Sequence, residues 1–194
     1  MRILFVCTGN TCRSPMAERI MSHKCRQAGL GHEVKSAGIA AVEGAPISPH
    51  ARTVLQRKGI NSEGGAQSVS KELVDWAELI LTMTMNHKNR LVRQFPEAVD
   101  KVHTLKEFAI DDPETRRLRK EAEALAGEIQ MKMALSQPIG DEERRRWLEL
   151  EQALPSDDVA DPFGGDLQTY EQTAEELEQL IDLVIRRLGS GNAA

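Results

Sequence analysis

Short uninterrupted apolar runs alternate along this chain with stretches in which apolar residues return every three or four positions. The first run, Ile3–Val6, is typical of a strand buried on both faces of a parallel sheet. Pro15 then suits the first turn of a helix, where its missing N–H needs no partner, and apolar residues follow at helical spacing. The whole pattern predicts strands over 2–6, 33–36, 78–82 and 101–104, and helices over 15–28, 48–57, 70–76, 86–94 and 168–188.

Alternating strands and helices with short links are the pattern of a parallel sheet wound on both faces. We therefore predict an α/β fold, a doubly wound, Rossmann-like parallel sheet of about four strands flanked by helices. Folds of this kind bind ligands beyond the carboxyl ends of their strands. The loop that follows the first strand is thus the first place to look for chemistry.

Residues 111–158 do not fit this alternation. They hold 13 acidic and 8 basic residues, so the segment carries a net charge of −5, equal to that of the whole chain. Apolar spacing predicts one helix, Gln137–Gly140 interrupts it, and Asp141 is placed to cap a second. The apolar positions of the first helix are Leu118, Ala122, Leu125, Ile129 and Met133. We expect one domain over residues 1–194, with a helical-hairpin insertion at 112–157.

Composition narrows the class of protein. The 194 residues are 40% hydrophobic and 28% charged, which is ordinary for a soluble globular protein. A net charge of −5 argues against nucleic acid as the main partner, and no apolar run approaches the length of a membrane span. A strand within three residues of Met1 argues against a signal peptide, and three cysteines suit a reducing compartment. We therefore expect a cytoplasmic protein without nucleic-acid or membrane partners.

The loop from Cys7 to Ser14 carries the strongest chemical signal. It runs from the first predicted strand into the first predicted helix, so its N–H groups and the helix N-terminus face one small cavity that attracts anions. Cys7 and Arg13 stand six positions apart on this loop. A thiol nucleophile and a planar, two-pronged cation placed together are suited to hold a phosphate and to attack it.

Each residue of the loop has an expected role. Cys7 is the nucleophile, since a helix N-terminus and a nearby guanidinium favour its thiolate. Arg13 binds phosphate oxygens and stabilises the charge that develops on them during transfer. Ser14 donates its hydroxyl to the Cys7 sulfur. Gly9 permits a positive φ, and Asn10 tolerates the left-handed region and braces the loop.

Other interpretations of the loop are weaker. A cysteine after a buried strand is usually a small core residue, but Cys7, Arg13 and Ser14 together argue against that here. The sequence contains neither G-x-x-x-x-G-K-[ST] nor G-x-G-x-x-G. Cys7 and Cys12 would be half of a zinc site, but no second Cys/His pair stands at ligand spacing, so we expect no metal and no cofactor. The histidines, which we interpret as structural or solvated, are His23, His32, His50, His87 and His103.

At the residues of this loop the chain resembles the low-molecular-weight protein tyrosine phosphatase family. Further blocks extend the resemblance over residues 1–110 and 159–188, and the Cys-x5-Arg-Ser loop with a late Asp-Pro is a specific pair. The resemblance implies hydrolysis of phosphorylated proteins through a phosphocysteine intermediate. The other blocks are Ser36–Gly38, Gly59–Ile60, Ala77–Met83, Lys101–Leu105 and Asp161–Gly165, followed by a long C-terminal helix.

Thr11 and Phe163 make the chain similar to the bacterial protein-arginine phosphatase branch of that family. Tyrosine-directed members usually carry a bulkier aliphatic residue at the position of Thr11, and often Tyr or Trp near that of Phe163. Threonine leaves a smaller, more polar wall that suits a phosphoguanidinium, although it can also be a merely tolerated loop residue. Val69, where tyrosine-directed relatives often have arginine, points weakly in the same direction.

The chemistry of hydrolysis calls for an acid, and the late Asp-Pro supplies one. Asp161 is expected to protonate the leaving group and then to activate the water that cleaves the phosphocysteine. Pro162 stiffens this segment, Gly164–Gly165 lets it move, and Phe163 can stack on a planar guanidinium. Asp112–Pro113 is a rival pair, but it lacks the Phe-Gly-Gly that follows Asp161.

The expected site therefore draws on both ends of the chain. Its catalytic residues are Cys7, Arg13 and Asp161. The insertion at 112–157 leads directly into the acid segment, so it is either a solvated decoration or a docking or gating element. The residues expected to contact substrate or phosphate are Thr8, Gly9, Asn10, Thr11, Cys12, Arg13, Ser14 and Phe163.

We predict a cysteine-dependent phosphatase that hydrolyses phosphoarginine in proteins, with phosphorylated proteins as its partners. The alternative is a tyrosine phosphatase of the same mechanism that acts on aryl phosphates. A thiol-coupled arsenate reductase needs further late cysteines, and none follows Cys25. A non-catalytic phosphate-binding or adaptor protein needs neither a nucleophile nor an acid, so Cys7 and Asp161 argue against it.

Cys12 suggests redox regulation. It stands five positions from Cys7 in the same loop, and a reactive thiolate beside a second thiol can oxidise reversibly to a disulfide. The hypothesis is that peroxide switches the enzyme off and that thiols restore it. Cys12 can instead be a packed loop cysteine, and Cys25, on a predicted helix, is interpreted as inert.

Overall fold

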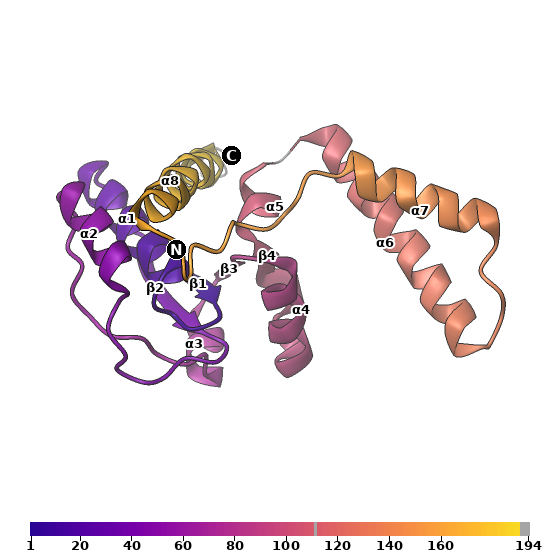
Figure 1. Ribbon diagram of the computed structural model, residues 1–194, viewed down its shortest axis with the longest axis horizontal. Coiled ribbons are helices and arrows are strands. Elements are labelled where there is room, and N and C mark those ends of the chain that lie inside the picture. Colours follow the sequence, from indigo (N-terminus) through magenta and orange to yellow (C-terminus); the bar gives the residue numbers. More distant parts are fainter. Residues whose placement is uncertain (111, 191–194) are drawn as a thin grey trace. The chain divides into compact units, whose positions relative to one another are not determined.

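The computed structural model describes residues 1–110 and 112–190, and its centre is a four-stranded parallel sheet (Figure 1). The strands are β1 (Arg2–Cys7), β2 (Glu33–Gly38), β3 (Leu79–Thr82) and β4 (Val102–Thr104). Their order in the sheet is β2-β1-β3-β4, and each pairing is parallel. The predicted fold class, a doubly wound parallel sheet of about four strands, is confirmed.

The register places the end of β1 where the strand order reverses. Cys7 pairs with Gly38 of β2 on one side, and Val6 pairs with Thr82 of β3 on the other. The chain leaves β1 toward β2 and later leaves β3 toward β4, so the two connections depart in opposite directions. Such a switch point opens a crevice beyond the carboxyl ends of the two strands, which is where ligands bind in open α/β sheets.

Successive residues of β1 enter two different cores, which explains why its sequence is an uninterrupted apolar run. Ile3 and Phe5 join the larger core, and Leu4 and Val6 join the smaller core on the opposite face. Helices cover both faces of the sheet (Figure 1). The larger core is built with α1 (Arg13–Gln27), α2 (Pro49–Arg57), α5 (Leu105–Ala109) and α8 (Leu167–Ser190), and the smaller with α3 (Lys71–Trp76), α4 (Met85–Gln94) and the 3-10 helix η1 (Pro96–Lys101).

Hydroxyl side chains define where several of these helices begin. The side chains of Ser48, Ser70 and Thr84 each accept a hydrogen bond from a backbone N–H in the first turn of α2, α3 and α4. Thr104 caps α5 in the same way, and Glu107 completes a capping box. The apolar periodicity does not predict η1 and α5. The five residues of α5 are too few to display a helical period, and η1 is a 3-10 helix, which repeats every three residues and not every 3.6.

Residues 112–156 form a second compact unit, which contains α6 (Pro113–Ala134) and α7 (Asp141–Ala153). The two helices are joined by charged pairs, among them Arg146 Nε, which donates to a Glu121 carboxylate oxygen at 2.7 Å. Two helices therefore occupy the segment that the sequence analysis assigns to a hairpin. The wider expectation, one domain with an insertion at 112–157, stays a prediction.

One detail of this hairpin differs from the sequence analysis. The sequence predicts Asp141 as the cap of the second helix, but Asp141 is the first helical residue and Gly140 precedes it. The Gly140 N–H donates to the Glu143 carboxylate at 2.8 Å. Glycine has no side chain to cap the helix, so the polar contact at this helix start comes from the Glu143 carboxylate.

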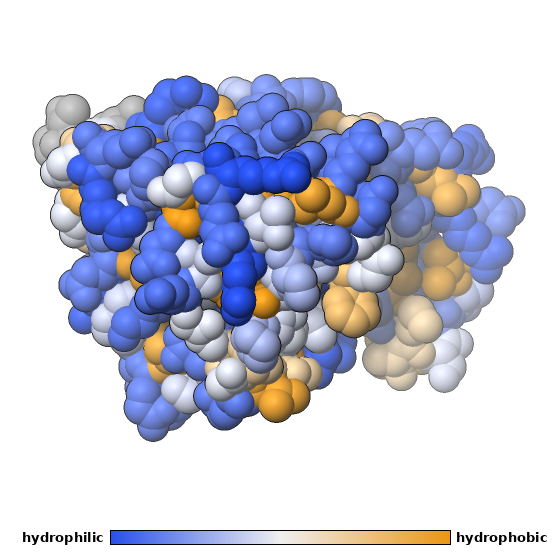
Figure 2. Space-filling view, turned by 60° about the vertical axis from the view of Figure 1, so that its left-hand side comes forward, coloured by the Kyte–Doolittle hydropathy of each residue, from blue (hydrophilic) through white to orange (hydrophobic). Residues whose placement is uncertain are grey.

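Hydrophilic residues predominate on the face shown in Figure 2, with apolar residues scattered between them. Within residues 1–110 and 112–190, no helix combines the length and the apolarity needed to cross a membrane. Some large apolar side chains are nevertheless highly exposed, and Phe163 is 80% exposed. Because Phe163 belongs to the Asp-Pro segment, its exposure bears on the candidate site.

Candidate active site

The loop from Cys7 to Ser14 lies at the carboxyl end of β1 and leads directly into α1. The carbonyl oxygens of Cys7 and Thr8 accept the N–H groups of Ile39 and Ala40 at 3.0 and 2.9 Å. Gly38 lies so close to the loop that a Cβ there would stand 2.6 Å from the Thr8 carbonyl oxygen. The end of β2 therefore holds the loop from one side, and only glycine fits at that position.

Cys7 is buried at the floor of this loop, with 3% of its surface exposed. Its Sγ lies 2.9 Å from the Ser14 hydroxyl and accepts the Asn10 N–H at 3.3 Å. The Ser14 hydroxyl also lies 3.4 Å from the Ala37 carbonyl oxygen, so the sulfur is the nearer of its two acceptors. A thiolate at Cys7 would thus receive two hydrogen bonds, one from the Ser14 hydroxyl and one from the Asn10 N–H.

Asn10 braces the loop from inside. Its φ is +54°, in the left-handed region, and only 2% of its surface is exposed. The side-chain NH₂ donates to the Ser14 hydroxyl at 2.9 Å and to the Ser36 hydroxyl at 2.8 Å, while the side-chain oxygen accepts the Gln67 N–H at 2.9 Å. Asn10 therefore ties the loop to β2 and to the segment before α3, and it orients the serine that faces Cys7.

Arg13 joins the two ends of the chain. It is the first residue of α1 and is 4% exposed. Its Nη2 donates to Asp161 Oδ2 at 2.7 Å, and its Nη1 donates to the Val159 carbonyl oxygen at 3.2 Å. The predicted cation and the predicted acid are therefore in direct contact although 148 positions separate them in the sequence.

The segment that carries Asp161 is anchored beside the end of β3. The Val159 N–H donates to the Met83 carbonyl oxygen at 2.8 Å, and the Asp158 carboxylate accepts the Met85 N–H at 2.8 Å. Asp161 itself is only partly buried, with 53% of its side chain exposed. A carboxylate that is held beside a buried arginine and is open to solvent can exchange protons with a bound molecule and with water.

Phe163 and the glycines after Asp161 shape the mouth of the site. The Phe163 N–H donates to Asp161 Oδ1 at 3.2 Å, and the Phe163 side chain is 80% exposed. Gly164 has a φ of +79°, which turns the chain back so that the Gly165 N–H reaches the Pro162 carbonyl oxygen at 2.9 Å. An exposed aromatic ring therefore stands two residues from the candidate acid.

Thr11 and Cys12 form the side of the loop that faces α2 and α8. Thr11 Oγ1 lies 3.6 Å from Cys12 Sγ, and its carbonyl oxygen accepts the Ser48 N–H at 2.9 Å. Cys12 is 6% exposed, and its Sγ lies 3.3 Å from the Tyr170 hydroxyl. Cys7, Cys12 and Cys25 are all free thiols. Burial, and secondarily the contact with Cys12, raises the pKa of Tyr170.

Asp112, the rival acid, lies at the start of α6. Asp112 accepts the Thr115 N–H at 2.7 Å and so caps α6. Among residues 1–110 and 112–190, no cluster of three or more His, Cys, Asp or Glu side chains is arranged to hold a metal ion. Asp112 therefore serves a helix end, whereas Asp161 faces Arg13.

His87 is buried near the Cys7–Ser14 loop. From the sequence alone, His87 is interpreted as structural or solvated. It lies in the first turn of α4, is 4% exposed, and has one ring nitrogen 2.8 Å from the Thr8 hydroxyl. Burial, with Arg13 as the next cause, lowers the pKa of His87 to about 4. Its place at the start of the helix after β3 was a usable signal, because that helix begins at the same sheet edge as the Cys7 loop.

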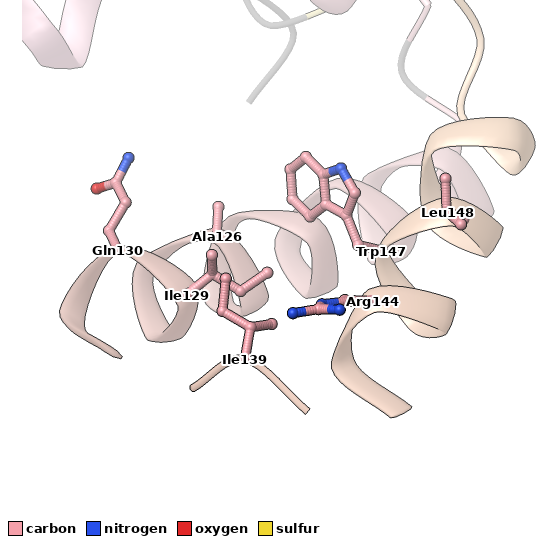
Figure 3. Close-up of a pocket in the computed structure, with 7 residues that line it drawn as sticks. All are labelled: Ala126, Ile129, Gln130, Ile139, Arg144, Trp147 and Leu148. Atoms are coloured by element: carbon pink, nitrogen blue, oxygen red, sulfur yellow. The ribbon is translucent and has the colours of Figure 1, made fainter. Parts of the chain in front are cut away.

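A separate pocket of about 490 Å³ lies within the α6–α7 unit (Figure 3). Its walls are mainly apolar, and Trp147, Ile129 and Ile139 line it together with Arg144. Its lining includes neither a nucleophile nor a carboxylate. The side chains that are suited to act on a phosphate therefore lie at the loop after β1 and not in this pocket.

Comparisons with known proteins agree with the site geometry. A family model described as low molecular weight phosphotyrosine protein phosphatase matches residues 2–119. The protein-arginine-phosphatase of Geobacillus stearothermophilus is 38% identical over 187 residues, which cover 96% of this chain and 95% of the relative. That of Bacillus subtilis (strain 168) is 33% identical over 188 residues, which cover 97% of each. A solved cysteine-to-serine mutant of YwlE arginine phosphatase, with its active-site serine phosphorylated, has a TM-score of 0.73 and 32% identity, and the match covers 97% of this chain and 96% of that one.

Proposed function

This chain belongs to the low-molecular-weight phosphotyrosine protein phosphatase family, and on that premise we propose that it hydrolyses phosphoarginine in proteins through a phosphocysteine intermediate. The observation that carries the proposal is the contact of Arg13 with Asp161 at 2.7 Å beside the loop that holds Cys7. This contact brings a nucleophile, a two-pronged cation and a carboxylate to one sheet edge. Those three groups are what transfer of a phosphoryl group to sulfur and then to water needs.

Binding comes first. The N–H groups of the loop and the N-terminus of α1 attract the phosphate, and Arg13 offers two N–H groups to its oxygens. Arg13 also donates to Asp161 and to the Val159 carbonyl oxygen. A bound phosphate therefore competes with Asp161 for the guanidinium, and this competition frees the carboxyl group to act on the leaving group.

In the first chemical step the Cys7 thiolate attacks phosphorus and the phosphorus–nitrogen bond breaks. Asp161 gives its proton to the departing guanidine nitrogen, so arginine leaves and a phosphocysteine forms. In the second step the Asp161 carboxylate takes a proton from water, whose oxygen attacks phosphorus. The sulfur–phosphorus bond breaks, its electrons return to Cys7 as a thiolate, and the Ser14 hydroxyl at 2.9 Å stabilises that charge.

The arginine preference rests on two side chains and on the relatives. Thr11 presents a small polar side chain beside Cys12, where a bulkier aliphatic residue would press on a phenyl ring. Phe163, 80% exposed and adjacent to the acid segment, offers a face on which a planar guanidinium can stack. Two protein-arginine-phosphatases match this chain over at least 95% of their own length, which supports the same substrate class here.

The remaining expectations from the sequence are proposed with it. Phosphorylated proteins are the partners, and the sites of contact are the loop residues 8–14 together with Phe163. We place the protein in the cytoplasm, as its free cysteines suggest. The segment 112–157 is proposed as an insertion into one catalytic domain.

The test compares a phosphoarginine peptide with a matched phosphotyrosine peptide in the presence of a chelator. We expect kcat/KM to favour phosphoarginine, to vanish in Cys7→Ser, and to fall in Asp161→Asn mainly through kcat. A phosphotyrosine preference would keep the mechanism and refute the substrate. A wild-type protein no more active than Cys7→Ser on both peptides would refute the proposed function as a whole.

A further inference from the structure

His87 links the helix after β3 to the phosphate loop after β1. One ring nitrogen, Nε2, lies 2.8 Å from the Thr8 hydroxyl, and the other, Nδ1, lies 2.8 Å from the Thr84 hydroxyl. The ring is enclosed, with 4% of the residue exposed. Thr8 follows the nucleophile directly, so His87 contacts the loop at the residue next to the reacting sulfur.

The surroundings of His87 keep its ring neutral. Burial is the main cause that lowers its pKa to about 4, and the Arg13 guanidinium acts in the same direction. Asp158 and Asp161 from the acid segment oppose this effect, while Arg90 on the same helix adds to it. A neutral imidazole carries one N–H, so it donates a hydrogen bond at one nitrogen and accepts one at the other.

The hydrogen bonds of Thr84 indicate which nitrogen carries the proton. As the cap of α4, the Thr84 hydroxyl oxygen already accepts the backbone N–H of His87 at 3.2 Å. Its own proton is then free to point at Nδ1, which leaves Nε2 as the donor to Thr8. In the opposite tautomer the Thr84 oxygen would accept two donors, and the Thr8 proton would be used up on the ring.

We propose that His87 is a positioning residue that orients the Thr8 hydroxyl so that its proton points to a phosphate oxygen in the loop. The inference rests on the proposed phosphatase function and adds to it a residue that acts through Thr8. Thr8 is exposed at the loop, and its carbonyl oxygen is fixed by the Ala40 N–H at 2.9 Å. With the backbone held in this way, the side-chain torsion of Thr8 is the remaining freedom, and the imidazole removes it.

The test uses two substitutions, each of which keeps one of the two hydrogen bonds that the imidazole makes. In His87→Gln the longer amide reaches the place of Nε2 and keeps the contact with Thr8. In His87→Asn the shorter amide keeps the place of Nδ1 and the contact with Thr84. If orientation of Thr8 matters, kcat/KM stays within about threefold of wild type in His87→Gln and falls about 10- to 100-fold in His87→Asn, as loss of a hydrogen bond to a charged group predicts.

If His87 only stabilises the start of α4, its contact with Thr84 is the one that matters. His87→Asn should then keep its activity and His87→Gln should lose it. If His87 instead orients Thr8, Thr8→Val should show the same loss as His87→Asn, and the double variant should lose no more than either alone. Thr8→Ser, which keeps a hydroxyl, should recover most of the activity. Thr8 is exposed, so these variants fold even where a change at His87 does not.

The matched control is His103→Asn. His103 is another partly enclosed histidine whose pKa burial lowers, but its ring lies against Phe108 at 5.6 Å, away from the phosphate loop. Its substitution should leave kcat/KM unchanged. If the wild type is active and either His87→Asn or Thr8→Val keeps full activity, the inference on His87 is overturned and the proposed function stands. If the wild type is no more active than Cys7→Ser, the proposed function itself is overturned.

Discussion

Replacement of Arg13 by lysine should damage stability and activity through the same lost geometry. Arg13 spans two acceptors, Asp161 Oδ2 at 2.7 Å and the Val159 carbonyl oxygen at 3.2 Å, and 4% of it is exposed. A lysine keeps the charge but presents a single ammonium group, which cannot reach both acceptors with the planar fork of arginine. The substitution therefore separates the loss of geometry from the loss of charge.

The magnitude follows from the contacts. A hydrogen bond to a charged group contributes about 1.5–3 kcal/mol, but the Asp161 side chain is 53% exposed and solvent screens the pair. We therefore expect a loss of about 1–2 kcal/mol in the free energy of unfolding, which is roughly 2–8 °C in Tm for a chain of this size. The effect on activity should be larger, because one lost donor to a developing oxyanion lowers kcat about 10²- to 10³-fold.

The assay measures Tm by circular dichroism and kcat/KM on a phosphoarginine peptide for wild type, Arg13→Lys and Arg57→Lys. Arg57 pairs with Glu171 at the surface, where the two side chains are 59% and 39% exposed, so its replacement should change Tm by little and kcat/KM not at all. Arg13→Lys with kcat/KM within threefold of wild type would refute the argument that the two-pronged contact is needed. If Arg13→Lys lowers Tm no more than Arg57→Lys does, the hydrogen bonds from Arg13 to Asp161 and Val159 contribute nothing to stability.

Three further predictions concern specificity, redox state and pH. Thr11→Ile should lower the ratio of kcat/KM for phosphoarginine over phosphotyrosine about tenfold, because a branched aliphatic side chain favours an aryl ring, and an unchanged ratio would contradict the role of Thr11. Cys12→Ala should lose the thiol-driven recovery of activity after peroxide, and full recovery would count against a Cys7–Cys12 disulfide. The pKa of His87 is about 4 in the folded protein and about 6.5 in the unfolded chain. The neutral imidazole therefore contributes up to about 3 kcal/mol to the free energy of unfolding above pH 6.5, and this contribution declines as the pH falls toward 4. Thermal unfolding of wild type and His87→Gln between pH 4 and 7 should show a steeper loss in wild type, and parallel curves would contradict this linkage.

The elements that the sequence predicts well are those set by neighbours in the chain. The run Ile3–Val6 is predicted as a strand buried on both faces, and in the structure it lies between two cores. The start of α2 follows from Ser48 and Pro49, which cap and begin the helix by local hydrogen bonding and fixed backbone geometry. Elements as short as α5 are missed, because five residues cannot show a period of 3.6 even when Thr104 and Glu107 form a complete capping box.

The candidate site also has a part set by neighbours in the chain and a part set by distant contacts. The sequence by itself determined the Cys7–Ser14 loop, because a strand, a tight turn and a helix start follow one another there and Cys7, Arg13 and Ser14 lie within eight consecutive residues. The resemblance named Asp161 as the acid, but only the tertiary structure shows its contact with Arg13, 148 positions away. Only the tertiary structure brings Tyr170 to Cys12 and His87 to Thr8, at separations of 158 and 79 positions. Local propensity carries no information on such distances, since they arise from the order of the strands, and that order brings the loops after β1 and β3 and the segment before α8 to one sheet edge.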